Sequence, residues 1–352
     1  ESGKIAVDPG PSVRAELQVR GRDFKRRTEA AQEARMAPAL TRDGHRIHVL
    51  ANVSDASGAE RAIENGADGI GVLRTELLYS RRAVLPTEEE QVEDLKAVLK
   101  AVGDRPVTIR VFDIGGDKPV SFLDLTEEAN PFLGWRGIRL ALSRADLLAT
   151  QLRAVLRASV SGTVRLLFPM VSLLEELEEC AALLETVRGE LERSGVPHAE
   201  PAEIGAMIEV PSAAIMVRRL VEKVDFVSLG TNDLTQYVLA ADRTNPRTAA
   251  MADGMHPAVL RLVRETAISA RDLGKGLSLC GQLASDPLAV PILIGLGINE
   301  LSVDPFAVPG TKAVVHTLDL ATCRRLGETA IELDTAGEVR DLVREQLGLG
   351  SR

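Results

Sequence analysis

The chain has 352 residues, of which 45% are hydrophobic and 26% are charged, and its formal net charge at pH 7 is −9. This composition allows a buried core, and the acidic balance argues against general nucleic-acid binding without excluding a local basic site for an anion. The longest apolar stretches, such as residues 288–298, are well short of the roughly 18 residues that a membrane span requires, so no membrane insertion is expected.

Cysteine usage and the N-terminal composition indicate a cytoplasmic setting. Cys180, Cys280 and Cys323 show no short paired spacing, which is typical of a reducing compartment. Residues 1–35 are highly charged and lack a signal-peptide pattern. The chain begins with Glu1 rather than Met, from which we expect a fragment of a longer protein.

The N-terminal segment differs in pattern from the rest of the chain. Residues 13–36 are rich in helix formers, contain no proline and carry only a thin apolar stripe. Such a stripe buries little surface and predicts a solvated connecting helix. The turn-forming stretch TRDGH (41–45) follows. We therefore predict a helical linker over residues 1–44 and one further domain over residues 45–349.

From residue 45 onward, short apolar segments alternate with helix-like segments such as 88–102, 172–195 and 256–274. The apolar segments are nearly continuous, as expected of strands that are buried on both faces. Eight β–α alternations in about 280 residues predict a (β/α)₈ TIM barrel. An open doubly wound sheet is the alternative, and the absence of a GxGxxG turn after the first strand disfavours it. The predicted strands are 45–53, 66–76, 105–117, 163–171, 203–211, 224–233, 276–284 and 297–305.

Polar side chains stand where six of the eight predicted strands end. Loops begin at strand ends, so one polar residue there means little, but six strands ending this way indicate an active site at the C-terminal face of a barrel. The residues at these ends are Arg74, Thr75 and Glu76; Arg110 and Asp113; Glu209; Asn232 and Asp233; Cys280 and Gln282; and Asp304.

The residue types at these ends suggest the chemical class of the ligand. The guanidinium groups of Arg74 and Arg110 match phosphate or carboxylate oxygens through two parallel hydrogen bonds. Glu209 and Asp233 leave neighbouring strands and could share Mg²⁺. In the alternative interpretation, each carboxylate forms a structural salt bridge with an arginine. Arginines beside metal-binding carboxylates favour a small phosphorylated acid as ligand.

Six blocks of sequence, in order, resemble the phosphoenolpyruvate (PEP)-utilising enzymes, and in particular the C-terminal PEP-binding domain of Enzyme I of the bacterial sugar phosphotransferase system. Dikinases and PEP synthases share the barrel and the TNDLTQ and RTE blocks, whereas FDIGGDK and NPFLGWR favour Enzyme I. The blocks are GVLRTELLY (71–79), IRVFDIGGDK (109–118), NPFLGWRGIR (130–139), GAMIEVPSA (205–213), DFVSLGTNDLTQYVLAADR (225–243) and LCGQLASD (279–286).

The resemblance implies a role for each matching position. Glu209 and Asp233 would be the Mg²⁺ ligands, and Gly230 is interpreted as the residue that lets the chain bend sharply after the sixth strand, just before Asp233. Arg74, Arg110 and Arg243 would hold the phosphoryl group, with Asn232 adding a polar contact, and Arg136 and Lys118 match further basic positions. The implied substrate-binding residues are thus Arg74, Arg110, Arg136, Lys118, Asn232 and Arg243.

Cys280 would be the catalytic acid–base residue. Loss of phosphate from PEP leaves the enolate of pyruvate, and a thiol with an ordinary pKa near ~8.5 can deliver a proton to its methylene carbon. The structural alternative is that Cys280 is a small core residue. The family usually has glutamate two residues after this cysteine, where this chain has Gln282, which puts the rate in more doubt than PEP binding.

The phosphoryl acceptor implied by the family is a histidine on a separate domain, which in turn serves a histidine phosphocarrier protein. None of the histidines here lies in the Thr-Ser-His-like segment that the family uses, so this chain is predicted to bind PEP but to pass phosphate to nothing alone. A homodimer is expected. A dikinase or PEP synthase domain, or a PEP-sensing dimerisation module whose chemistry has decayed, remain alternatives. The histidines are His45, His48, His198, His256 and His316.

Overall fold

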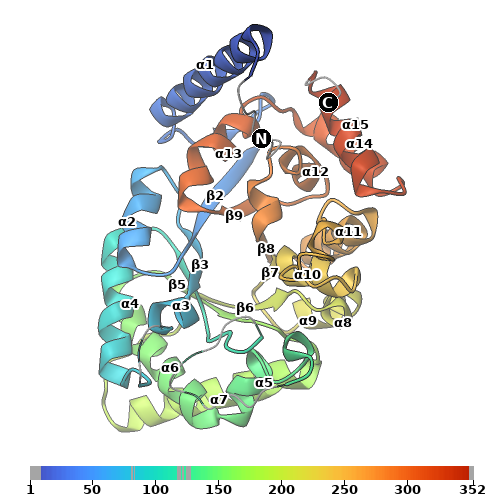
Figure 1. The fold of residues 1–352 in the computed structure, drawn as a ribbon. Coiled ribbons are helices and arrows are strands. Elements are labelled where there is room, and N and C mark those ends of the chain that lie inside the picture. The colour runs from blue at the N-terminus through green and yellow to red at the C-terminus, as the bar shows by residue number, and fades with distance from the viewer. Residues whose placement is uncertain are drawn as a thin grey trace.

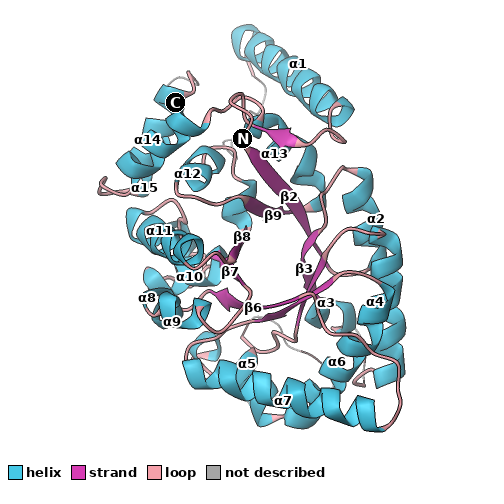
Figure 2. Cartoon of the chain, turned by 180° about the vertical axis from the view of Figure 1, so that it is seen from behind, coloured by secondary structure: helices cyan, strands magenta, loops and turns pink. Residues whose placement is uncertain are grey.

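Eight parallel strands close into a barrel in the computed structural model, which describes residues 9–348 apart from 81, 83, 117–119, 121–122 and 124–127. Strands β2 to β9 pair in chain order, and β9 pairs with β2 to complete the circuit (Figure 2). The predicted (β/α)₈ barrel is confirmed, and the closed circuit excludes the open doubly wound sheet. The strands are β1 (Ala39–Leu40), which joins β2 antiparallel, β2 (Arg46–Val53), β3 (Ile70–Arg74), β4 (Val107–Arg110), β5 (Val164–Phe168), β6 (Glu203–Ile208), β7 (Phe226–Gly230), β8 (Gly276–Cys280) and β9 (Glu300–Val303).

Helices surround the barrel and cover the outward faces of its strands (Figure 1). The predicted helix at 88–102 is α4, and its start is fixed by a capping box in which Thr87 and Glu90 each accept a hydrogen bond from the other's backbone N–H. The helices are α1 (Pro11–Glu33), α2 (Ala56–Glu64), α3 (Thr75–Tyr79), α4 (Glu88–Val102), α5 (Ile138–Ser143), α6 (Ala145–Ala158), α7 (Leu174–Arg193), α8 (Pro211–Ile215), α9 (Val217–Val221), α10 (Thr231–Val238), α11 (Pro257–Asp272), α12 (Val290–Gly295), α13 (Val308–Val315), α14 (Leu320–Ala330) and α15 (Ala336–Gln346).

Side chains along the strands alternate between an outer core and the barrel interior. On β8, Leu277 and Leu279 join the large core beneath the helices, whereas Cys280 belongs to a small separate cluster. That cluster draws its members from five different strands, which meet only inside the barrel. Its members are Val72, Leu167, Met207, Phe226 and Cys280. The Cys280 thiol therefore points inward at the C-terminal end of its strand.

Helix α1 lies outside the barrel, and none of its residues is buried, as expected for the solvated helix that the sequence predicts (Figure 1). The chain just after it is attached to the barrel by the buried Lys312, whose Nζ donates hydrogen bonds of 3.0 Å to the carbonyls of Arg35 and Ala37. The boundary of the linker at residue 44 remains a prediction. Over the described part of the chain, no helix combines the length and apolarity needed to cross a membrane.

Gly71 on β3 offers a test of how tightly the barrel interior is packed. A Cβ at this position would lie 2.1 Å from Ser302 Oγ and 3.0 Å from Leu50 Cβ. We expect Gly71→Ala to lower the free energy of unfolding by about 1–3 kcal/mol through overpacking. Gly189 on α7 has nothing within 4 Å of the same point, so Gly189→Ala should stabilise by up to about 1 kcal/mol. Urea denaturation of both variants measures the contrast, and equal behaviour would contradict the close contact at Gly71.

Candidate active site

Most of the predicted site residues lie where neighbouring strands leave the same end of the barrel. Arg74 and Arg110 end β3 and β4 and pair in register, and Cys280 ends β8 opposite Gly230 of β7. Glu209 follows β6 directly, while Asn232 and Asp233 occupy the first turn of α10 after β7. Lys118 lies outside the described residues.

Arg110 is buried among carboxylates rather than left open. Its guanidinium pairs with Glu76 at 2.5 Å and with Asp113 at 3.4 Å, and its side chain is 7% exposed. Its Nε has no hydrogen-bond partner among the described residues. Arg110 is therefore held in place from one side while one N–H remains available.

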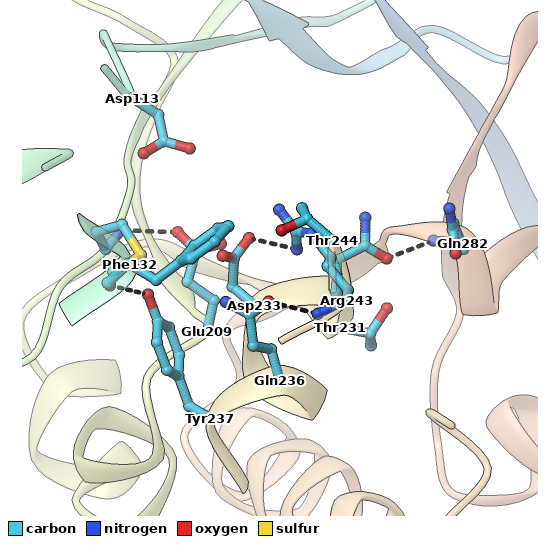
Figure 3. A network of polar contacts seen from close by, with 12 residues as sticks. Asp113, Phe132, Glu209, Thr231, Asp233, Gln236, Tyr237, Arg243, Thr244 and Gln282 are labelled. Carbon is cyan, nitrogen blue, oxygen red and sulfur yellow. Dashed lines mark hydrogen bonds and ion pairs between the residues drawn. The ribbon is translucent and has the colours of Figure 1, made fainter. Parts of the chain in front are cut away.

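Arg136 and Asp233 continue this network of buried charges. Arg136, fully buried, reaches Asp113 at 3.2 Å and Asp233 at 3.0 Å. The second oxygen of Asp233 accepts from Arg243 at 3.2 Å (Figure 3). Consecutive members of the set thus alternate in sign, and we call it the charge chain: Glu76, Arg110, Asp113, Arg136, Asp233 and Arg243.

Glu209 lies beside the charge chain without a cation of its own. Its Oε1 accepts a hydrogen bond of 2.7 Å from the backbone N–H of Met170, and no described residue donates to Oε2. Burial raises the pKa of Glu209 to about 7, with Asp233 and Asp113 adding to the shift and Arg110 opposing it. The salt-bridge alternative thus describes Asp233 but not Glu209, which is a buried carboxyl group that lacks a counter-ion.

Gly230 is required here for a different reason from the predicted one. Its φ is −90°, which any residue adopts, so the expectation of a sharp bend that only glycine allows is wrong. A Cβ at Gly230 would instead lie 2.5 Å from Glu209 Oε2. Glycine at this position lets the carboxylate pack directly against the β7 backbone.

Cys280 and Arg74 face the same interior space. The thiol is 8% exposed, and Ser228 Oγ lies 3.8 Å from its sulfur. Burial raises the pKa of Cys280, Glu209 adds to the rise, and Arg110 and Arg74 act against it. Arg74 is partly buried, and its side chain has no hydrogen-bond or ion-pair partner in the described part of the chain. The pair thus combines a protonated thiol with an available guanidinium.

Asn232 connects the end of β7 to the loop after β8. Its side-chain oxygen accepts a 2.9 Å hydrogen bond from the backbone N–H of Gln282 (Figure 3). The contact uses the Gln282 main chain, while the side chain of that residue is exposed. Glutamine in place of the family's glutamate therefore leaves this link between the loops intact.

A cavity of about 320 Å³ opens next to these residues. Glu209 and Cys280 are not among the residues that line it. The cavity therefore lies beside the interior site and does not contain it. Its polar lining includes Asn232, Arg243, Asp253, Gln282, Asp286 and Arg340.

Residues 28–320 match the family model for the PEP-binding domain of PEP-utilising enzymes. The chain belongs to this family. It is 41% identical over 344 residues to a phosphoenolpyruvate-protein phosphotransferase of Staphylococcus carnosus, covering 98% of this chain and 60% of that protein. Identity is 42% over 351 residues, with the coverage again 98% and 60%, to the phosphotransferase of the same name from Haemophilus influenzae. It is 46% over 343 residues to a multiphosphoryl transfer protein of Rhodobacter capsulatus, covering 97% of this chain and 40% of that protein. The chain thus spans only part of the length of these relatives.

The number of carboxylates in the site suits a magnesium ion, which needs few protein ligands, better than a metal held by three or more side chains. The described residues contain no group of three or more His, Cys, Asp or Glu side chains arranged to hold a metal. Mg²⁺ usually takes one or two carboxylates together with substrate oxygens and water. Glu209 and Asp233, from adjacent strands and side by side in Figure 3, supply that number.

Sequence reasoning overlooked the residues that hold the site in shape. Asp113 was recognised at a strand end but not given a role, yet it is fully buried between Arg110 and Arg136. Tyr237 donates a hydrogen bond to the carbonyl of Phe132, whose ring lies beneath Arg136 at 5.8 Å. The spacing of four between Asp233 and Tyr237 on one helix face was the available clue.

The raised pKa of Glu209 predicts a pH-dependent stability. In the unfolded chain this carboxyl ionises near its ordinary value of 4.5, but in the folded domain only near 7. Between these pH values the folded state binds more protons, so stability falls as pH rises through the window and is flat above it. We expect Glu209→Gln to remove this fall and to raise the melting temperature of the metal-free chain at pH 8 by several degrees. Thermal denaturation at pH 5 and pH 8 measures it, with the exposed Glu328→Gln as control, and an unchanged profile would contradict the buried, unpaired state of Glu209.

Proposed function

We propose that this chain is the PEP-binding half of a PEP–protein phosphotransferase, which moves the phosphoryl group of PEP to a histidine on a separate domain and releases pyruvate. The observation that carries the proposal is the meeting of Arg74, Arg110, Glu209, Asp233 and Cys280 at one end of a barrel of the PEP-binding family. The arginines match the phosphoryl group of PEP, the two carboxylates match a metal ion bound to it, and the thiol matches its methylene carbon.

The arginines are assigned to the phosphoryl group. Arg74 is available, and the buried Arg110 is oriented by Glu76 and Asp113, so it binds without much loss of side-chain freedom. Arg243, partly exposed on the cavity wall, neutralises charge from the other side, and Asn232 adds a polar contact. Arg136 is buried between two carboxylates, which supports a role in orienting Asp113 and Asp233 rather than direct contact with phosphate. Lys118 stays a predicted further basic contact.

Glu209 and Asp233 are assigned to Mg²⁺, which when bound would offset negative charge on the phosphoryl and carboxylate oxygens of the substrate. The buried Glu209 carboxyl supports this because it has no other counter-ion among the described residues. Asp233 is held by Arg136 and by Arg243, of which the second is 25% exposed.

Cys280 is assigned to proton transfer. Breaking the bond between phosphorus and the enol oxygen, as phosphorus bonds to the acceptor histidine, leaves the enolate of pyruvate. The Cys280 thiol then gives its proton to the methylene carbon, which yields pyruvate and a thiolate that regains a proton from solvent. The raised pKa of Cys280 supports the donor role because it keeps the thiol protonated at neutral pH.

The remaining assignments follow from relatives that are longer than this chain. We assign the acceptor histidine to another domain of the parent protein, with a histidine phosphocarrier as the next partner in sugar transport. We further assign a cytoplasmic homodimer. The names of the relatives above favour this phosphotransferase over a dikinase or PEP synthase.

Calorimetric titration of the chain with PEP tests the binding site. We expect saturable binding that needs Mg²⁺ and is lost in EDTA. Arg74→Ala should weaken binding by about tenfold or more, because a charge-assisted contact is removed, and should leave the melting temperature unchanged because Arg74 holds no described partner. Asp233→Asn should abolish the requirement for Mg²⁺ together with tight binding. Equal affinity in Mg²⁺ and in EDTA would refute the metal assignment.

Exchange of pyruvate methyl protons with D₂O tests Cys280 without an acceptor domain. In Mg²⁺ the chain should catalyse exchange, because enolisation reverses the proton transfer, and the rate should rise with pH as the thiolate forms. Cys280→Ala should lose the exchange while PEP affinity stays within a factor of about two. Exchange is followed by proton NMR, and Cys180→Ala serves as the matched control. Exchange at the wild-type rate in the Cys280 variant would remove Cys280 from this role.

A further inference from the structure

The C-terminal helix reaches the two loops that complete the site through one side chain. Arg340 on α15 forms a bidentate pair with Asp253, through Nε at 3.1 Å and Nη2 at 2.9 Å. Its third nitrogen, Nη1, bonds Asp286 at 2.8 Å. The three nitrogens of this guanidinium thus bind carboxylates of two different loops, Nε and Nη2 that of Asp253 and Nη1 that of Asp286.

Each of the two aspartates is anchored within its own loop. Asp253 Oδ1 accepts from the backbone N–H of Met255 at 3.0 Å, and Asp286 Oδ1 accepts from that of Leu288 at 2.9 Å. Each carboxylate therefore has a fixed place on its loop, and Arg340 sets the separation between them.

These loops carry predicted site residues at their other ends. The connection between α10 and α11, residues 239–256, contains both Arg243 and Asp253, and the connection that follows Cys280 at the end of β8 contains Gln282 and Asp286. They also touch each other, because a Cβ on Gly254 would lie 3.2 Å from Leu283 Cδ1. A shift of one loop would therefore displace the other.

Arg340 also forms a wall of the cavity that opens beside Asn232 and Arg243. The helix that carries it, α15, packs on α14 near the C-terminus (Figure 1). It is separated in sequence from the strand-end residues of the site. Val339 and Val343, both fully buried, fasten the helix to the molecule independently of the ion pairs.

We propose that Arg340 is a positioning residue, which sets the distance between the loop that contains Arg243 and the loop that follows Cys280 and so aligns phosphate binding with proton transfer. This inference rests on the proposed function above. The side chains of Arg340, Asp253 and Asp286 are 27%, 29% and 25% exposed, and the buried Val339 and Val343 hold the helix without these ion pairs. Their effect should therefore appear at the site rather than in the melting temperature.

Arg340→Ala is compared with Arg344→Ala on the same helix, since Arg344 pairs only within α15, with Asp341 at 2.8 Å. The first readout is the rate at which iodoacetamide alkylates Cys280, with Cys180 and Cys323 as internal controls because both are fully buried. The second readout is the Kd for PEP in saturating Mg²⁺.

We expect Arg340→Ala to raise the alkylation rate of Cys280 several-fold and the Kd for PEP about tenfold, with the melting temperature close to wild type. Arg344→Ala should change neither. Arg340→Lys keeps the charge but lacks the fork that spans two carboxylates, so it should fall between wild type and Arg340→Ala. If Arg340→Ala does not fold, Arg340→Lys and Asp286→Asn decide the matter in the same assays.

Unchanged Cys280 alkylation and unchanged Kd in these variants would overturn the proposal. Faster alkylation of all three cysteines together, with a lower melting temperature, would also overturn it, because Arg340 would then only support the fold. The alkylation assay needs no PEP, which separates the two hypotheses. Wild-type protein that fails to bind PEP, while Arg340→Ala still exposes Cys280, refutes the proposed function and retains the positioning role.

Discussion

The charge chain at the barrel mouth is the constraint on which the site depends. Arg110 and Arg136 are buried, and burial of an arginine is tolerated only where carboxylates surround it closely. Asp113 serves both, so neither arginine turns without disturbing the other. This shared partner, together with Asp233 on the far side of Arg136, fixes the two guanidinium groups in one arrangement. Glu209 lies outside these pairs, and burial raises its pKa, with Asp233 and Asp113 adding to the rise.

The barrel supplies this network with rigid supports. Strand alternation turns Cys280 inward while its neighbour Leu279 packs under the helices, so the thiol is placed by the backbone rather than by a flexible loop. Glycines admit the close approaches that follow. Gly281, with φ at +106°, leaves no room for a Cβ, which would lie 2.4 Å from Thr231 Oγ1. The exits of β7 and β8 therefore meet at a separation that larger residues would widen.

The sequence allowed the barrel, its eight strands and the gathering of polar strand-end residues at one end to be predicted, because strand periodicity and strand-end residues are local patterns. It did not reveal which carboxylate pairs with which arginine. Asp233 is paired and Glu209 is not, although both follow buried strands in similar sequence contexts. Asp233 pairs with Arg243, ten residues further on, and with Arg136, about 100 residues away in the chain. The second pairing joins distant segments, and such pairings leave no periodic trace. The reason for Gly230 was missed likewise, since it depends on a side chain from the adjacent strand.

Burial acts on two neighbouring titratable groups at the barrel mouth, Glu209 and Cys280. It raises the pKa of both Glu209 and Cys280, and the Glu209 carboxylate adds to the rise at the thiol. Compensation of Glu209 by a cation therefore removes one of the influences that hold the Cys280 proton in place. Arg110 and Arg74, which lower the pKa of this thiol, would then weigh more. The charge at the carboxylates is thus coupled to the acidity of the Cys280 thiol, because Glu209 raises the pKa of that thiol while Arg110 and Arg74 lower it.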